Sequence, residues 1–139
     1  MTQSHKVLHT AKTYTTGNRA NGSSRSSDGR LDISFTNPGS AGTGTSPEQL
    51  LAAGWSACFM GAMGLAAAKL KVPTPASLAI GAEVDLCVVD GSYFLQARLD
   101  IHAPGMEREL VQSLVEAAHQ TCPYSKATHG NIDVSLNVV

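Results

Sequence analysis

The sequence is poor in charged residues, in aromatic residues and in cysteine. Asp, Glu, Lys and Arg make up 15% of the 139 residues, against about 25% in an average soluble domain. Aromatic residues make up 5%. The formal net charge is −1 at pH 7, so the chain lacks the positive field that would attract nucleic acid or an anionic membrane. The shortage of charge favours a surface that is partly buried against a second subunit.

A disulfide framework and a secretion signal are also missing. Three cysteines, an odd number, are too few for a disulfide-stabilised secreted fold. Residues 1–14 contain no apolar segment behind a basic patch, so no signal peptide is visible. We therefore expect a cytoplasmic protein, in which cysteines more often have a chemical role than a structural one.

One long uncharged run interrupts the polar sequence. Residues 50–68 are nineteen consecutive positions without a charge, long enough as a helix to span ~28 Å. Seven of them are alanine and three are glycine, so the run is only weakly hydrophobic and lacks the Leu, Ile and Val surface of a membrane span. We expect a buried helix of a globular fold rather than a membrane helix.

What is present suffices for one hydrophobic core. Hydrophobic residues make up 42% of the chain, which excludes a disordered polypeptide, and the length fits one domain. The patterns predict strands at 7–14, 23–27 and 31–35, a loop at 37–46, a helix at 47–71, strands at 80–88 and 93–103, a helix at 107–120 and a strand at 132–138. Asp28-Gly29 and Asp90-Gly91 are turn signals. We expect the aromatic side chains of Tyr14, Trp55, Phe59 and Tyr93 to lie in the core rather than to contact a cofactor. We predict a single α+β domain over residues 1–139, with helices packed on curved sheet.

The three cysteines differ in their predicted surroundings. Cys87 shares a strand face with Glu83 and Asp85, whose carboxylates disfavour a thiolate, so we expect it to be inert. Cys58 lies in the middle of the apolar helix, where burial alone raises the pKa of a thiol. Cys122 lies where the second helix ends and a new turn begins, and amides at a helix start stabilise a thiolate.

Residue types alone leave three uses of these groups open. His119, Cys122 and His129 are metal-ligand types, but a zinc site would also need Cys58 from a distant segment. A cysteine hydrolase would use Cys58 with His119 or His129 as its base, although nothing in the pattern places either imidazole beside the thiol. An apolar cavity would also suit a non-catalytic module that binds small acyl ligands.

A thiol peroxidase combines more of these residues. It needs a thiolate in an apolar cavity, a guanidinium that keeps the thiolate ionised, and a second thiol that traps the sulfenic acid. Arg19 suits the second role because a guanidinium stays charged when desolvated, and Glu48 would orient it through a bidentate pair. Along one straight helix Glu48 and Cys58 are ~15 Å apart, so only a bridging arginine or a bent helix start links them.

Four segments of the sequence carry a family resemblance. They are residues 17–19 (Gly-Asn-Arg), 25–32 (Arg-Ser-Ser-Asp-Gly-Arg-Leu-Asp), 47–59 (PEQLLAAGWSACF) and 117–128 (AAHQTCPYSKAT), the last continued by 130–134 (GNIDV). In this order and at this spacing, the chain resembles the organic hydroperoxide resistance (Ohr) branch of the OsmC/Ohr superfamily along nearly its whole length. The Cys-Pro-Tyr-Ser form looks like Ohr rather than the OsmC branch.

The resemblance implies a cysteine-based peroxidase that reduces organic and fatty-acid hydroperoxides. It implies an OsmC/Ohr-like α+β fold, with a long central helix and a second helix packed on curved antiparallel sheets, in an intertwined homodimer with active sites at the subunit interface. Cys58 would be the peroxidatic cysteine and Cys122 the resolving one. Arg19 would activate the Cys58 thiolate, and Glu48 would hold Arg19. No metal, haem or flavin is implied, and the external reductant would be a lipoyl dithiol carried on a protein.

Four positions depart from the usual family pattern without removing any of these site residues. They are Asn18 for Gly, Ser46 for Asn, Trp55 for Tyr and His129 for Arg. Trp55 precedes Cys58 by one helical turn, so we expect this departure to bear on the substrate preference.

Overall fold

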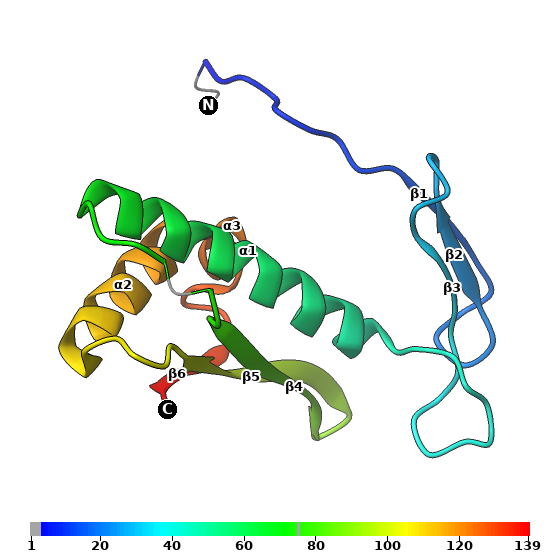
Figure 1. Ribbon diagram of the computed structural model, residues 1–139. Helices are drawn as coiled ribbons and strands as arrows, with labels where there is room; N and C mark the ends of the chain where they lie inside the picture. The colour runs from blue at the N-terminus through cyan, green and yellow to red at the C-terminus, as the bar shows by residue number, and fades with distance from the viewer. Residues whose placement is uncertain (1–3, 75) are drawn as a thin grey trace. The chain divides into compact units, whose positions relative to one another are not determined.

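The computed structural model describes residues 4–74 and 76–139, which fall into two compact units, Met1–Pro47 and Glu48–Val139. Each unit contains its own three-stranded sheet, β1-β2-β3 in the first and β4-β5-β6 in the second (Figure 1). That residues 1–139 act as a single domain stays a prediction.

The first unit is a small antiparallel sheet of β1 (Thr13–Thr16), β2 (Ser23–Ser26) and β3 (Asp32–Ser34). The predicted Asp28-Gly29 turn is confirmed: Gly29 has a φ of 74°, and Asp28 accepts hydrogen bonds from the Ser26 hydroxyl at 2.6 Å and the Arg30 amide at 3.0 Å. The predicted strand at 7–14 is wrong over most of its length. Pairing with β2 begins at Thr13, and the preceding apolar residues Val7 and Leu8 are exposed.

The second unit begins in the first turn of α1 (Pro47–Lys69). Proline at the first helical position and Glu48 in the first turn suit a helix start, and Lys69 lies in the last turn. The helix ends two residues before the predicted Lys71, whose φ of 57° is left-handed. The buried side chains of α1 repeat every three or four residues and define the face that enters the core: Trp55, Phe59, Ala62, Met63 and Ala67.

By length and composition alone, α1 is also the one helix of the described residues that is apolar enough to cross a membrane. The core helix of a soluble protein passes the same test. Trp55, Phe59 and Met63 belong to the same core cluster as side chains of the sheet and the second helix. Only 28% of the most apolar stretch of α1 is buried within one chain, so one face of the helix is buried and the expected burial on all sides is not observed.

A long hairpin forms most of the second sheet. β4 (Ala79–Val89) and β5 (Ser92–His102) pair antiparallel along their whole length. Asp90 and Gly91 have φ values of 48° and 76°, the left-handed pair that a two-residue hairpin turn requires. Both predicted strands and their turn are confirmed. Figure 1 shows the helices of this unit on one side of the sheet.

The pairing of the last strand differs from the prediction of antiparallel sheets. After β5 the chain forms α2 (Arg108–Thr121) and α3 (Pro123–Thr128), then returns as β6 (Asp133–Val138). β6 pairs with β5 in parallel, from Gln96↔Asp133 to Ile101↔Val138. A strand that is reached through a helical crossover runs in the direction of the strand before it. The sheet is therefore mixed.

The core of the second unit lies between the sheet and the helices. Its fully buried larger side chains come from α1, β5 and α2 and include Trp55, Phe59, Leu99, Ile101, Val111 and Leu114. Trp55 and Phe59 were predicted to be core residues and are, each with no exposed surface. Tyr14 and Tyr93 were predicted to be core residues too, and both are exposed, at 78% and 72%.

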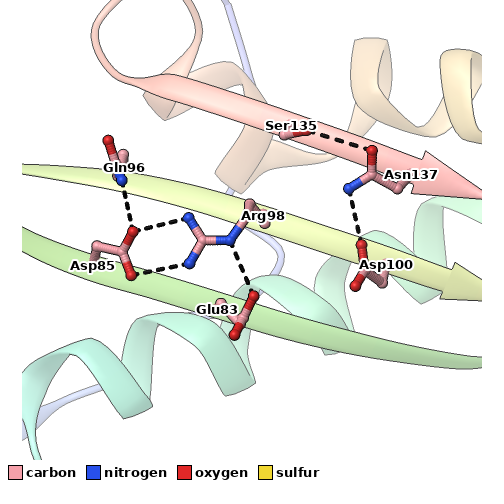
Figure 2. Close-up of polar contacts among 7 residues, drawn as sticks. All are labelled: Glu83, Asp85, Gln96, Arg98, Asp100, Ser135 and Asn137. Atoms are coloured by element: carbon pink, nitrogen blue, oxygen red, sulfur yellow. Dashed lines mark hydrogen bonds and ion pairs between the residues drawn. The ribbon is translucent and has the colours of Figure 1, made fainter.

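The other face of this sheet is polar, as the alternation predicts. Figure 2 shows the Arg98 guanidinium between two carboxylates of β4, with Nη1 at 2.8 Å from Asp85 and Nε at 3.0 Å from Glu83. Gln96 donates a further hydrogen bond to Asp85 at 2.7 Å. The hydrogen bonds from Arg98 and Gln96 lower the pKa of Asp85 to about 2.

Candidate functional site

Two thiols from distant segments meet in the second unit. Cys122 Sγ lies 3.4 Å from Cys58 Sγ, within the distance of a hydrogen bond between two thiols. A disulfide bond is ~2.05 Å long, so the sulfurs are in contact and unbonded, and both cysteines are free. Cys122 is fully buried and Cys58 is half-buried. The pair therefore has one enclosed thiol and one that reagents can reach.

Cys122 sits at the junction between two helices. Its backbone amide donates to Ala118 at 2.7 Å and closes α2, while its carbonyl accepts from the Lys126 amide at 2.9 Å and opens α3. Pro123, at the start of α3, lacks an amide proton and cannot continue α2. Cys122 is thus the C-terminal cap residue of α2 and the N-terminal cap residue of α3, and its side chain is fully buried in the core.

A backbone amide at the start of α3 faces the sulfur of Cys58 rather than that of Cys122. Cys122 makes no side-chain capping bond to α3, so the expected stabilisation of its own sulfur is absent. The Tyr124 backbone N–H instead donates to Cys58 and lowers its pKa, an effect smaller than the increase caused by burial. The Cys122 thiol raises the pKa of Cys58 as well. Within the second unit Cys58 therefore has a raised pKa, and a thiolate there needs a further positive charge.

Two more contacts join α1 to α3 beside the thiols. Trp55, one helical turn before Cys58, donates from Nε1 to the Ser125 hydroxyl at 3.2 Å. A Cβ at Gly54 would lie 2.9 Å from the Tyr124 hydroxyl, so the tyrosine covers that glycine. These contacts were not predicted from the sequence. The available signals were positions 54, 55 and 58, which lie on one side of a helix, and the Cys-Pro-Tyr-Ser order.

The two candidate imidazoles contact each other. The rings of His119 and His129 are 6.3 Å apart in an edge-to-face arrangement, and the buried His119 Nδ1 has no hydrogen-bond partner. Burial, and secondarily the neighbouring His129, lower the pKa of His119. The thiol contact of Cys58 is with Cys122, so the geometry gives a Cys-His hydrolase no support.

Arg19 and Glu48 lie in different units. Arg19 is half-buried in the turn between β1 and β2, and Glu48 is in the first turn of α1. Ten residues of one helix separate Glu48 from Cys58, ~15 Å of rise. The roles of Arg19 and Glu48 stay predictions. Cys87 lies in β4 opposite Phe94, away from the thiol pair in sequence.

A metal site finds no support in the described residues. Between positions 4 and 139, apart from residue 75, no three His, Cys, Asp or Glu side chains form a group that could hold an ion.

A cavity of about 410 Å³ lies between α1 and α2, lined by Leu65, Ala66, Lys69, Leu70, Ser113, Ala117 and Thr121. An apolar ligand would fit such a lining.

Comparison with known proteins gives the family. The family described as "OsmC-like protein" matches residues 39–137. The organic hydroperoxide resistance protein of Xanthomonas axonopodis pv. citri (strain 306) is 44% identical over an alignment of 142 positions, which covers 99% of each chain. OhrB of Bacillus subtilis (strain 168) is 40% identical over 135 residues, which cover 95% of this chain and 98% of that one.

Solved structures agree. The crystal structure of Bacillus subtilis OhrB superposes with a TM-score of 0.89 at 41% identity, and covers 96% of this chain and 100% of that one. An organic hydroperoxide resistance protein of Vibrio cholerae, described with captopril in one of its active sites, has a TM-score of 0.88 at 32% identity over 98% of this chain and 95% of that one. The chain thus belongs to the OsmC-like family, in its organic hydroperoxide resistance branch, and the predicted α+β fold class is confirmed.

Proposed function

We propose that this protein is a thiol peroxidase that reduces alkyl and fatty-acid hydroperoxides to alcohols. The observation that carries the proposal is the 3.4 Å separation of the Cys58 and Cys122 sulfurs. A role in organic hydroperoxide resistance follows from the names of the full-length relatives. The paired thiols supply a chemical mechanism for that role.

The reaction has three steps. The Cys58 thiolate attacks the distal peroxide oxygen, the O–O bond breaks, and the alkoxide takes a proton and leaves as the alcohol. Cys58 is then a sulfenic acid. The Cys122 thiol attacks the sulfenic sulfur, a disulfide forms and water leaves. A dithiol finally reduces the disulfide by exchange and is itself oxidised.

Cys58 is the better candidate for the attacking residue. It is half-buried while Cys122 is fully buried, so a bulky peroxide reaches Cys58 more readily. The Tyr124 amide faces Cys58 and favours its thiolate. Cys122, held at the junction of two helices, is placed to trap the product of the first step.

The thiolate needs a cation because burial raises the pKa of Cys58. We assign this role to Arg19, and assign to Glu48 the orientation of the guanidinium. A guanidinium stays charged in a desolvated site and offers a planar pair of donors to a carboxylate. For the final step we assign a lipoyl dithiol on a partner protein, in the cytoplasm, where such reductants maintain free thiols.

A homodimer is part of the proposal. Only 28% of the most apolar stretch of α1 is buried within one chain. Large apolar side chains are exposed on α1 and on the β4–β5 hairpin. Those on α1 and directly after it are Leu65 and Leu70, and those near the hairpin tip are Leu86, Val88, Tyr93 and Phe94. Apolar patches of this kind mark protein interfaces. Light scattering after gel filtration should give twice the 14.5 kDa of one chain, and a monomer would contradict the assembly.

The decisive test is the intact mass of the reduced protein after one equivalent of cumene hydroperoxide. The peroxidase should lose two hydrogens per chain, and the Cys87→Ser variant should lose the same two. A non-catalytic module that binds acyl ligands, for which the 410 Å³ cavity is the supporting observation, would keep its mass. An unchanged mass would therefore overturn the peroxidase.

A further inference from the structure

A buried hydrogen bond runs beside the thiol pair. Trp55 Nε1 donates to Ser125 Oγ at 3.2 Å, and both residues have no exposed surface. Seventy residues separate these partners in sequence. A buried donor or acceptor that loses its partner is costly, because water cannot replace it. This bond is therefore a strong constraint on where α3 lies against α1.

The bond and the thiol contact link the same two segments at the same spacing. Trp55 precedes Cys58 by three residues, so both project from one side of α1. Ser125 follows Cys122 by three residues, in the first turns of α3. A displacement of α3 that breaks the indole–hydroxyl bond therefore also moves Cys122 relative to Cys58.

α3 is too short to be stable alone, so its position depends on its contacts with α1 and α2. It has six residues, far fewer than an isolated helix needs for stability, and no side chain caps its first turn. Tyr124 makes two further contacts with α1: its amide faces Cys58, and its side chain, which is 40% exposed, covers Gly54. Among the described residues, the side-chain hydrogen bond that joins α1 to α3 with both partners fully buried is the one between Trp55 and Ser125.

We propose that Trp55 and Ser125 are positioning residues for the thiol pair. Their hydrogen bond keeps α3 docked so that the Cys122 sulfur stays within reach of Cys58, and it thereby sets the effective concentration of one thiol toward the other. The use of this proximity in peroxide turnover rests on the proposed function. The proximity itself is a property of the fold and can be measured without peroxide.

The measurement is the equilibrium of the thiol pair with glutathione, in a Cys87→Ser background that removes the third thiol. Both protein thiols and one glutathione disulfide exchange to give the protein disulfide and two reduced glutathiones, so atoms and electrons balance. The equilibrium constant divided by that of a simple thiol gives the effective concentration. Mass spectrometry after acid quenching reads out the oxidised fraction.

Ser125→Ala removes the acceptor and Trp55→Phe removes the donor while an aromatic ring remains. Each should lower the effective concentration about tenfold, the scale expected for one buried hydrogen bond. The double variant should lower the effective concentration little further than either single variant, because both substitutions remove the same hydrogen bond. Ser125→Thr, which keeps the hydroxyl, should recover part of the loss.

Ser113→Ala is the matched control. Its hydroxyl bonds to the Glu109 carbonyl one turn earlier in α2 at 3.2 Å and links no other segment, so the glutathione equilibrium should not change. If Ser125→Ala fails to fold, Trp55→Phe alone decides the question. A wild-type equilibrium in a folded Trp55→Phe or Ser125→Ala variant overturns the positioning role.

Failure of the proposed function would look different. If the variants shift the glutathione equilibrium but the wild-type protein consumes no peroxide, the positioning role holds and the peroxidase does not. If the protein is a peroxidase, Ser125→Ala should slow disulfide formation more than it slows consumption of the first equivalent of peroxide. A general loss of structure would slow both steps together.

Discussion

The Cys58 and Cys122 sulfurs lie 3.4 Å apart although 64 residues separate the two cysteines in sequence. A disulfide needs ~2.05 Å, so the sulfurs must approach by about 1.4 Å. Cys122 lies between two helices and has a backbone hydrogen bond to each. We expect that the disulfide forms through a local shift at this junction, without unfolding of α1.

Cys87→Ser should leave peroxidase activity within about twofold of wild type, because a cysteine of this kind contributes packing rather than chemistry. Cys87 lies in β4 opposite Phe94, and the alternation along the strand puts it on the face of Glu83 and Asp85. Steady-state turnover with a dithiol measures the effect. A loss of activity comparable with that of Cys58→Ser would mean that the thiol pair is misassigned.

Arg19→Ala should raise the pKa of Cys58 further and slow the peroxide step by orders of magnitude, because the thiolate would lose its cation. Arg19→Lys should restore only part of the rate, since an ammonium lacks the planar fork of donors. The rate of Cys58 alkylation as a function of pH reports the change. Arg30→Ala, whose side chain is 90% exposed beside the Asp28-Gly29 turn, is the control. An unchanged alkylation profile in Arg19→Ala would remove Arg19 from the site.

Stability should fall as the pH drops below neutrality because of His119. Burial and the neighbouring His129 lower the pKa of His119 in the folded protein, so the unfolded chain binds the proton more readily. The contribution of neutral His119 to the free energy of unfolding is fully present above the unfolded pKa of about 6.5. It is lost as the pH falls toward the lower pKa of the folded protein. Urea midpoints at about pH 7.5 and about pH 5.5 should differ less in His119→Gln than in wild type. The exposed His102, replaced by Gln, serves as the control, and an equal slope in His119→Gln would refute the assignment.

Acid should also weaken the polar face of the second sheet. The folded pKa of Asp85 is about 2, against an ordinary value of 3.8. The stabilising contribution of the Asp85 carboxylate is present above pH 3.8, and it is lost as the pH falls from there toward about 2. Asp85→Asn should therefore be less stable than wild type near neutrality, and the difference should shrink in that acid range. Unfolding in urea across this range tests the trend, which a constant difference between the two proteins would contradict.

Local patterns predicted the second unit well. The alternation in β4 and β5, with Asp90-Gly91 between them, gave both strands and the turn within a residue or two. The helix predicted at 47–71 matches α1 (Pro47–Lys69) to within two residues. The direction of β6 was missed, because alternation shows which face of a strand is buried and not which way it runs. That direction depends on the crossover through α2 and α3.

Residue types alone did not predict which distant residues come into contact at the candidate site. The cysteines alone allowed a hydrolase, a zinc site or a peroxidase, and the family resemblance selected the pair that the structure brings together. Nothing local indicates that the Ser125 hydroxyl accepts from Trp55, because the partners are brought together only by the docking of α3. Tyr14 and Tyr93 show the converse, since aromatic side chains alone do not show which surfaces the fold covers.

The most direct test of the mechanism is stopped-flow peroxide consumption in a single turnover, with Cys58→Ser and Cys122→Ser compared. Cys58→Ser should consume no peroxide, because the attacking thiolate is gone. Cys122→Ser should consume one equivalent at a rate within about threefold of wild type, and its sulfenic acid should then persist or advance to sulfinic acid under excess peroxide. If Cys58→Ser keeps the first turnover and Cys122→Ser loses it, the roles of the two thiols are reversed and the account is contradicted.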